Sequence, residues 1–200
     1  MRPIQFSEVK NIYEYEKTRK EFREQAIASK KLHRMHIGNS MTMVFENQQS
    51  VLFQIQEMIR TEKIITDHAM QHEIETYNQL IPGDGELSAT LLIDITEKEL
   101  IKPMLDSLVG LNKNALYLKI GDDEISATFD DAQMDDDRIS AVQYIKFKLS
   151  EAQITAFGDE SIPVSIDVRH PNYLANHTLS HQQRSALFAD LRESNAGVLA

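Results

Sequence analysis

The hydrophobic period of this chain changes at the turn Pro82-Gly83-Asp84-Gly85, where a proline and two glycines stop regular structure. Before the turn, apolar residues recur every three or four positions over 51–59, the pattern of a helix with one buried face. After it, apolar and polar residues alternate over 87–95, which indicates a half-buried strand. The sequence therefore predicts an α+β fold in which a helical hairpin packs on a mostly antiparallel sheet. We expect a single domain over 1–200, mainly helical over 1–82 and sheet-rich over 86–192, with a C-terminal helix.

Helices dominate the part before the turn. Ser7 is expected to cap a long helix that runs to about Leu32. Residues 40–46 are predicted to form a short strand, and Asn47 to cap the central helix that follows it. A second capped helix is expected after Thr66, so that the two helices form an antiparallel hairpin.

Strands dominate the part after the turn. They are expected at 87–95, 115–120, 124–129, 139–149 and 162–168, with helices at 97–108, at 150–157 and from Ser180 onward. Ser180 and Gln183 have the spacing of a capping box. The acidic run at 130–137 lacks the order of ligands of a calcium loop, and we expect it to be a mobile acidic loop.

Composition excludes several classes of function. The chain has no cysteine, so it forms no disulfide, thiolate metal site or cysteine nucleophile. Its net charge of −10 disfavours nucleic acid and anionic membranes as partners. No segment has the apolar length of a membrane span, and the N-terminus lacks the apolar core of a signal peptide. We therefore expect a cytoplasmic protein.

One segment of this acidic chain is basic. It contains Arg19, Lys20, Arg23, Lys30, Lys31, His33, Arg34 and His36. Such a run is usually a solvated helix face that pairs with acidic surface, and the alternative is a site for an anion or an acidic partner. His33 and His36 are three residues apart and are expected to share a helical face, although no carboxylate accompanies them as a third metal ligand.

Acidic residues on and around the predicted hairpin form the main candidate site. The set is Glu46, Glu57, Glu62 and Glu73, with Arg60 to hold an anionic substrate. Glu62 is predicted to project from the apolar stripe of the central helix, where a carboxylate needs a cation, hydrogen-bond donors or a metal. The alternative is that Glu62 lies at a helix end that remains in water. Carboxylates on facing helices can hold paired divalent metals, but the Glu-x-x-His pattern of such sites is absent. We predict no cofactor, with a divalent metal on these four glutamates as the alternative.

His170 is a secondary candidate. It leaves a predicted strand just before Pro171, with Tyr173 close by in the sequence. A histidine at such a position can act as an acid, a base or a ligand, or be a turn residue that is satisfied by backbone groups.

Several segments resemble one known family. They are FENQQSVLFQIQEMIRTEKI, YNQLIPGDGELSATLLIDI, AVQYIKF and HPNY, and the likeness extends in order over nearly the whole chain. The sequence is similar to the uncharacterised bacterial family known as domain of unknown function 3501. It departs from that family in the histidines of KKLHRMHIG and in its longer acidic loop. The resemblance implies genes beside a rubrerythrin-like protein and an iron–sulfur oxidoreductase subunit, and it implies no reaction, catalytic residue or cofactor.

Two functions follow as expectations. The first is a non-catalytic accessory of a redox or oxidative-stress system that acts through a protein partner, either the rubrerythrin-like or the iron–sulfur protein. The second is a metal- or carboxylate-dependent enzyme with its site on the hairpin. A homo-oligomer is also possible through the second apolar face of the central helix, which carries Phe53 and Ile64.

Overall fold

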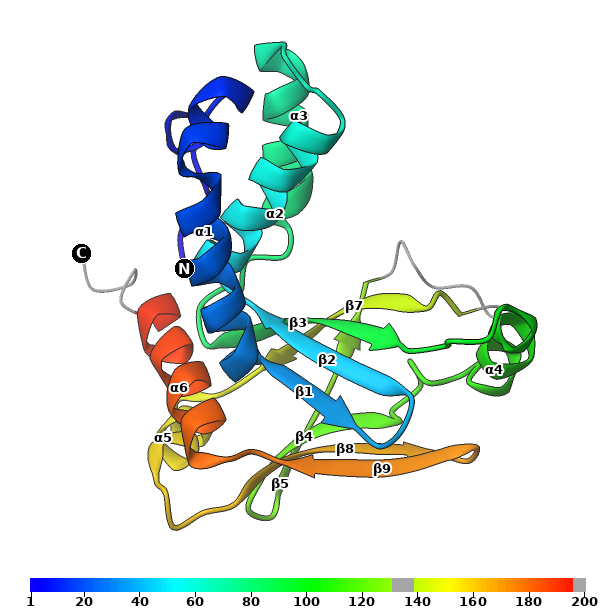
Figure 1. The fold of residues 1–200 in the computed structure, drawn as a ribbon. Coiled ribbons are helices and arrows are strands. Elements are labelled where there is room, and N and C mark those ends of the chain that lie inside the picture. The colour runs from blue at the N-terminus through cyan, green and yellow to red at the C-terminus, as the bar shows by residue number, and fades with distance from the viewer. Residues whose placement is uncertain (131–138, 196–200) are drawn as a thin grey trace.

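A computed structural model describes residues 1–130 and 139–195 of the chain, and it confirms the α+β class (Figure 1). The helices are η1 (Phe6–Glu8), α1 (Ile12–His33), α2 (Gln48–Thr61), α3 (Asp67–Asn78), η2 (Lys98–Leu100), α4 (Ile101–Ser107), α5 (Glu151–Gly158) and α6 (His181–Asn195). The strands are β1 (Arg34–Ile37), β2 (Met41–Glu46), β3 (Glu86–Ile93), β4 (Leu116–Ile120), β5 (Asp123–Ser126), β6 (Thr128–Phe129), β7 (Val142–Lys148), β8 (Val164–His170) and β9 (Tyr173–Thr178).

The first long helix begins later than the sequence suggested. Ser7 lies in η1, and α1 begins at Ile12 because the side chain of Asn11 accepts a hydrogen bond from the backbone N–H of Glu14. The helix ends at His33, and Arg34–Ile37 forms β1 instead of a further helical turn. His33 and His36 therefore do not share a helical face.

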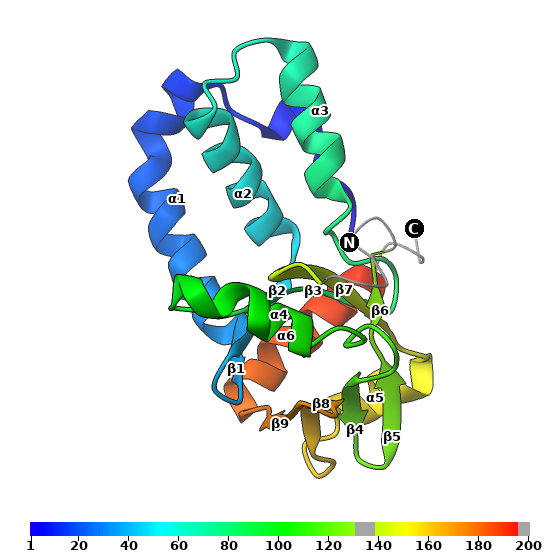
Figure 2. The same cartoon turned by 90° about the vertical axis from the view of Figure 1, so that its right-hand side faces the viewer.

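The predicted caps of α2 and α3 are confirmed. Asn47 accepts from the backbone N–H of Ser50 at the start of α2, and Thr66 does so from Ala69 at the start of α3. The two helices form the expected hairpin, with α1 on the other side of α2 (Figure 2). Between them lies a core cluster made of Ile4, Val51, Ile55, Ile59, Met70, Ile74, Leu80 and Ile81.

The end of α2 has the hydrogen bonds of a Schellman motif. The N–H of Ile64 donates to the carbonyl of Ile59 (2.9 Å), and the N–H of Lys63 donates to that of Arg60 (3.4 Å). Lys63 takes a left-handed conformation at φ 53° to close this turn. Ile64 then packs back on the core of the helical layer.

The strands of the described residues form two sheets, and every pairing between them is antiparallel. The first has the strand order β1-β2-β3-β7-β6, and the second has the order β5-β4-β8-β9. Leu87, Ala89, Leu91 and Ile93 are buried, as the alternation on β3 predicts. Together with inward residues of the other strands they form the larger core, which α5 and α6 complete through Phe157, Leu187 and Leu191.

Three details differ from the expected elements. The predicted strand 124–129 divides between the sheets, since β5 pairs with β4 and β6 pairs with β7. The predicted helix 97–108 divides into η2 and α4, with Pro103 in the first turn of α4, where its missing N–H costs no hydrogen bond. After His170 the chain turns into β9, which the sequence reading missed.

The acidic run at 130–137 was expected to form a loop. Of this run only Asp130 belongs to the described residues, and 131–137 lie outside them. In the described part of the chain, no helix combines the length and the apolar character needed to cross a bilayer.

Candidate functional site

Glu57, one of the predicted site residues, lies on α2 and is bound by two side chains of α1. Arg19 donates to it through two parallel hydrogen bonds, Nε to Oε1 and Nη2 to Oε2, each 2.8 Å long. The hydroxyl of the buried Tyr15 donates to Oε1 at 2.7 Å. The hydrogen bond from Arg19 lowers the pKa of Glu57, against the opposing effect of burial, and burial raises the pKa of Tyr15. The carboxylate of Glu57 thus joins α2 to α1 through an ion pair and a hydrogen bond.

The next two candidates on α2 face away from any shared centre. Arg60 donates to Glu16 of α1 at 2.5 Å. Glu62 is exposed, and its predicted place on the buried stripe is wrong, because α2 ends at Thr61 and Glu62 is the C-terminal cap. A carboxylate in water at a helix end needs no cation or metal.

Glu46 is buried, with 4% of its surface exposed, and is satisfied by neutral donors. Its Oε2 accepts from the hydroxyl of Ser50 (2.6 Å) and from the amide of Gln54 (2.9 Å). Its Oε1 accepts from the hydroxyl of Thr90 on β3 (2.8 Å). These bonds fix the start of α2 against the sheet, and they explain how the acid is accommodated inside the fold.

The four glutamates do not converge on one centre. Glu73 lies on α3, beside a cavity that none of the other three lines. Over residues 1–130 and 139–195, no group of three or more histidine, aspartate or glutamate side chains is placed to hold a metal ion. The hairpin therefore does not assemble the predicted cluster of Glu46, Glu57, Glu62 and Glu73.

The secondary candidates hold together loops. The buried His170 has its Nε2 3.0 Å from the carbonyl of Val109, and its Nδ1 accepts from the N–H of Asn172 (3.2 Å). These partners require the neutral tautomer that is protonated on Nε2. The hydroxyl of Tyr173 donates to the carbonyl of Ile37 (2.6 Å) and accepts from the N–H of Ser40 (3.0 Å), so it fixes the turn between β1 and β2.

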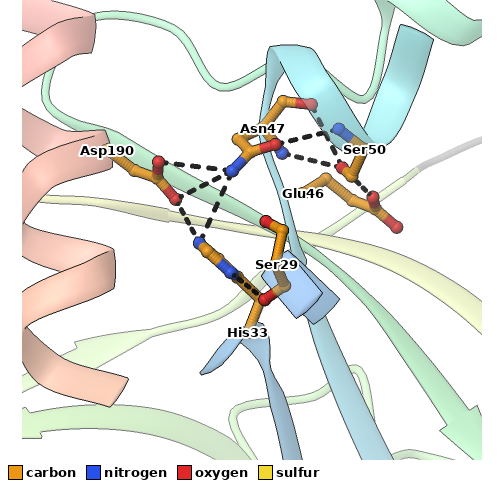
Figure 3. A network of polar contacts seen from close by, with 6 residues as sticks. All are labelled: Ser29, His33, Glu46, Asn47, Ser50 and Asp190. Atoms are coloured by element: carbon orange, nitrogen blue, oxygen red, sulfur yellow. Dashed lines mark hydrogen bonds and ion pairs between the residues drawn. The ribbon is translucent and has the colours of Figure 1, made fainter. Parts of the chain in front are cut away.

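A buried polar network joins α1, α2 and α6 (Figure 3). The imidazole of His33 contacts the carbonyl of Ser29 through Nδ1 and the carboxylate of Asp190 through Nε2, each at 2.8 Å. The amide of Asn47 donates to the same carboxylate (3.3 Å) while its Oδ1 caps α2. Sequence reasoning missed this network because no local pattern relates His33 to Asp190, which lies 157 residues further along the chain.

The charge of His33 follows from these contacts. Both ring nitrogens face acceptors, and only the protonated imidazolium can donate to both. Burial alone would lower the pKa of His33, but the hydrogen bonds to Asp190 and Ser29 outweigh it and raise that pKa. Because His33, Asn47 and Asp190 are buried, we assign the network to the stability of the fold.

The basic segment divides into cations used inside the fold and cations left at the surface. Arg19 pairs with Glu57, Lys30 lies over the ring of Phe53, and His33 contacts Asp190. The Nδ1 of His36 lies 3.0 Å from the hydroxyl of Thr42. The remaining four are exposed, and within the described residues they form no ion pair; they are Lys20, Arg23, Lys31 and Arg34. Arg19 and His33 thus pair with acidic groups of the fold, as the first interpretation of the segment expects. The four exposed cations fit the alternative, a site for an anion or an acidic partner.

The exposed cations lie along one side of α1. Lys20, Arg23, Ile27 and Lys31 follow at spacings of three and four, which places them on a common helix face, and Arg34 follows at the end of the helix. Ile27 lies at the centre of this face and is 44% exposed. Glu24 is an exposed acid near its start, and from Gln25 to Phe45 the sequence has none. We call Lys20, Arg23, Ile27, Lys31 and Arg34 the α1 basic face.

Comparison with known proteins places the chain in a family. The family described as protein of unknown function (DUF3501) matches residues 3–191, and the chain belongs to it. A crystal structure of a protein of unknown function from Burkholderia pseudomallei K96243 is similar, with a TM-score of 0.88 and 27% sequence identity. That match covers 95% of this chain and 100% of the other. No curated protein matches the chain.

Proposed function

We propose that this member of the DUF3501 family is an accessory protein of a redox or oxidative-stress system, and that it binds an acidic protein partner through the α1 basic face. The observation that carries the proposal is the row of exposed cations on α1 that have no ion pair within the described residues. Cations that a protein does not use internally remain available to a partner. Exposed Ile27 adds an apolar contact at the centre of the same face.

The charge of the rest of the chain favours one orientation of binding. With 31 acidic against 21 basic residues, most of the surface repels an acidic partner. The α1 basic face attracts it, so that encounter is directed to this helix and wrong orientations are suppressed. An acidic protein therefore fits better than a nucleic acid, because a polyanion of extended length would also meet the repelling surface around α1.

The redox part of the proposal rests on the composition and on the family resemblance. A chain without cysteine has no thiol chemistry of its own, which suits an accessory role beside a protein that carries the redox centre. The resemblance implies two such proteins, a rubrerythrin-like protein and an iron–sulfur oxidoreductase subunit.

The test is direct binding between the purified chain and each of the two proteins that the resemblance implies, at a series of salt concentrations. We expect a saturable complex whose affinity falls steeply as salt rises, because screening weakens attraction between exposed charges. The absence of a complex with either protein at every salt concentration would refute the proposed function.

A further inference from the structure

A cavity of about 430 Å³ is lined by residues of α3 and of the first sheet. Its sheet wall includes Ser88 of β3, Thr128 of β6 and Lys146 of β7. Ser88 and Thr128 are both register partners of Lys146, so these three residues form one row across neighbouring strands. A cavity of this size suits a small organic ligand.

Aromatic and apolar side chains form a large part of the cavity lining. Tyr77 of α3 and Tyr144 of β7 lie on opposite walls, and Phe129 and Leu80 also contribute. Glu73 and Tyr77 are four residues apart on α3 and both line the cavity, so they lie on one face of the helix. Burial raises the pKa of Tyr77, and Glu73 and Tyr144 raise it further. Aromatic faces of this kind attract organic cations as well as apolar groups.

Among the described residues that line the cavity, the charged ones are Glu73, Asp130 and Lys146. The ammonium of Lys146 lies 3.3 Å from the carboxylate of Glu86, which also accepts from the N–H of Gly83 (2.9 Å). Glu73 is half-buried on the opposite wall, and among the described residues no cation pairs with it and no donor bonds to it. The hydroxyl of Tyr77 likewise has no hydrogen-bond partner in the described part of the chain. A half-buried carboxylate beside an unused phenol is a site for a donor that carries positive charge.

We propose that this cavity binds a small organic ammonium compound with an apolar body, the ammonium group on Glu73 and the body between Tyr77 and Tyr144. The carboxylate accepts from the ammonium, and the tyrosine rings supply cation–π and apolar contact. The site lies on α3 and the sheet, so it is separate from the α1 basic face and does not depend on the proposed function.

The test compares three probes of similar size that differ in charge: phenethylamine, phenethyl alcohol and phenylacetate. Amide chemical shifts of the isotope-labelled full chain report both the affinity and the location of binding. We expect phenethylamine to give saturable shifts in α3 and β7, with an affinity about tenfold above that of the alcohol, as a charge-assisted hydrogen bond supplies. Phenylacetate is expected to bind less well than the alcohol.

Glu73→Gln is expected to remove the preference for phenethylamine over the alcohol, and Glu75→Gln, an exposed acid on the same helix, is expected to keep it. Tyr77→Leu should lower the affinity for all three probes, because it removes an aromatic ring from the cavity wall. A well-dispersed spectrum of each variant verifies that it is folded. Equal affinity for amine and alcohol, tighter binding of phenylacetate, an unchanged preference in Glu73→Gln, or no saturable shift at α3 and β7 would each overturn the proposal.

Discussion

The Nε2 of His33 lies 2.8 Å from the Oδ2 of Asp190, and this contact joins the end of α1 to α6 inside the fold. The opposite ring nitrogen of His33 is equally close to a backbone carbonyl. One imidazole thus links two helices that are far apart in the sequence, and it does so best when it is protonated.

The first prediction concerns the stability of the fold against pH. The pKa of His33 is raised in the folded protein above its ordinary 6.5. Because this pKa is raised, protonated His33 contributes its full stability to the fold below about pH 6.5. The contribution is lost as the pH rises through the pKa that His33 has in the folded protein. We expect His33→Gln to lower the free energy of unfolding by about 1–3 kcal/mol at mildly acid pH, with a smaller effect at alkaline pH.

Urea unfolding of wild type and His33→Gln at several pH values measures this difference. His68→Gln is the matched control, since His68 is exposed on α3. A difference between wild type and His33→Gln that stays constant, or grows, from acid to alkaline pH would contradict the assignment.

The second prediction concerns the buried carboxylate of Glu46. Its two oxygens accept three hydrogen bonds, from Ser50, Gln54 and Thr90. Glu46→Gln places an amide N–H₂ against at least one of these donors, and we expect a loss of about 1–3 kcal/mol in the free energy of unfolding. Thr90→Val removes a single donor and should cost less. Thermal or urea denaturation checks both, and a Glu46→Gln variant as stable as wild type would show that the network contributes nothing.

The third prediction concerns Glu57, whose carboxylate is clamped by Arg19 and Tyr15. The pKa of Glu57 is lowered below its ordinary 4.5, so its contribution is present above about pH 4.5 and is lost as pH falls through the folded value. We expect Glu57→Gln to cost about 1 kcal/mol near neutral pH and less in acid. Tyr15→Phe leaves the pair with Arg19 intact and tests the hydroxyl alone. An equal cost of Glu57→Gln at neutral and acid pH would argue against the clamp.

The sequence predicts well those features that are encoded within a few residues. The caps at Asn47, Thr66 and Ser180 depend on one side chain and the next turn of helix, and all three are present. The buried alternation of β3 likewise needs only its own residues.

Other features had no local signal. The α2 helix ends at Thr61, and a left-handed Lys63 closes the turn after its cap Glu62. Glycine usually marks such a position, and without it the apolar spacing predicts a helix that continues through Glu62. The four-residue strand β1 is too short to show a period, and its basic residues continue the composition of α1. The pairing of His33 with Asp190 and the cavity beside Glu73 arise from tertiary packing, which residue spacing does not encode.

The most direct test of the account is the affinity for an acidic redox partner when charge is reversed on α1. Arg23→Glu/Lys31→Glu changes the α1 basic face, and Lys98→Glu/Lys102→Glu changes two exposed lysines of η2 and α4 by the same total charge. If α1 binds the partner, the α1 variant loses about tenfold or more in affinity at low salt, while the control variant changes by about twofold or less. Equal loss in the two variants, or none in the α1 variant, would contradict binding through this helix.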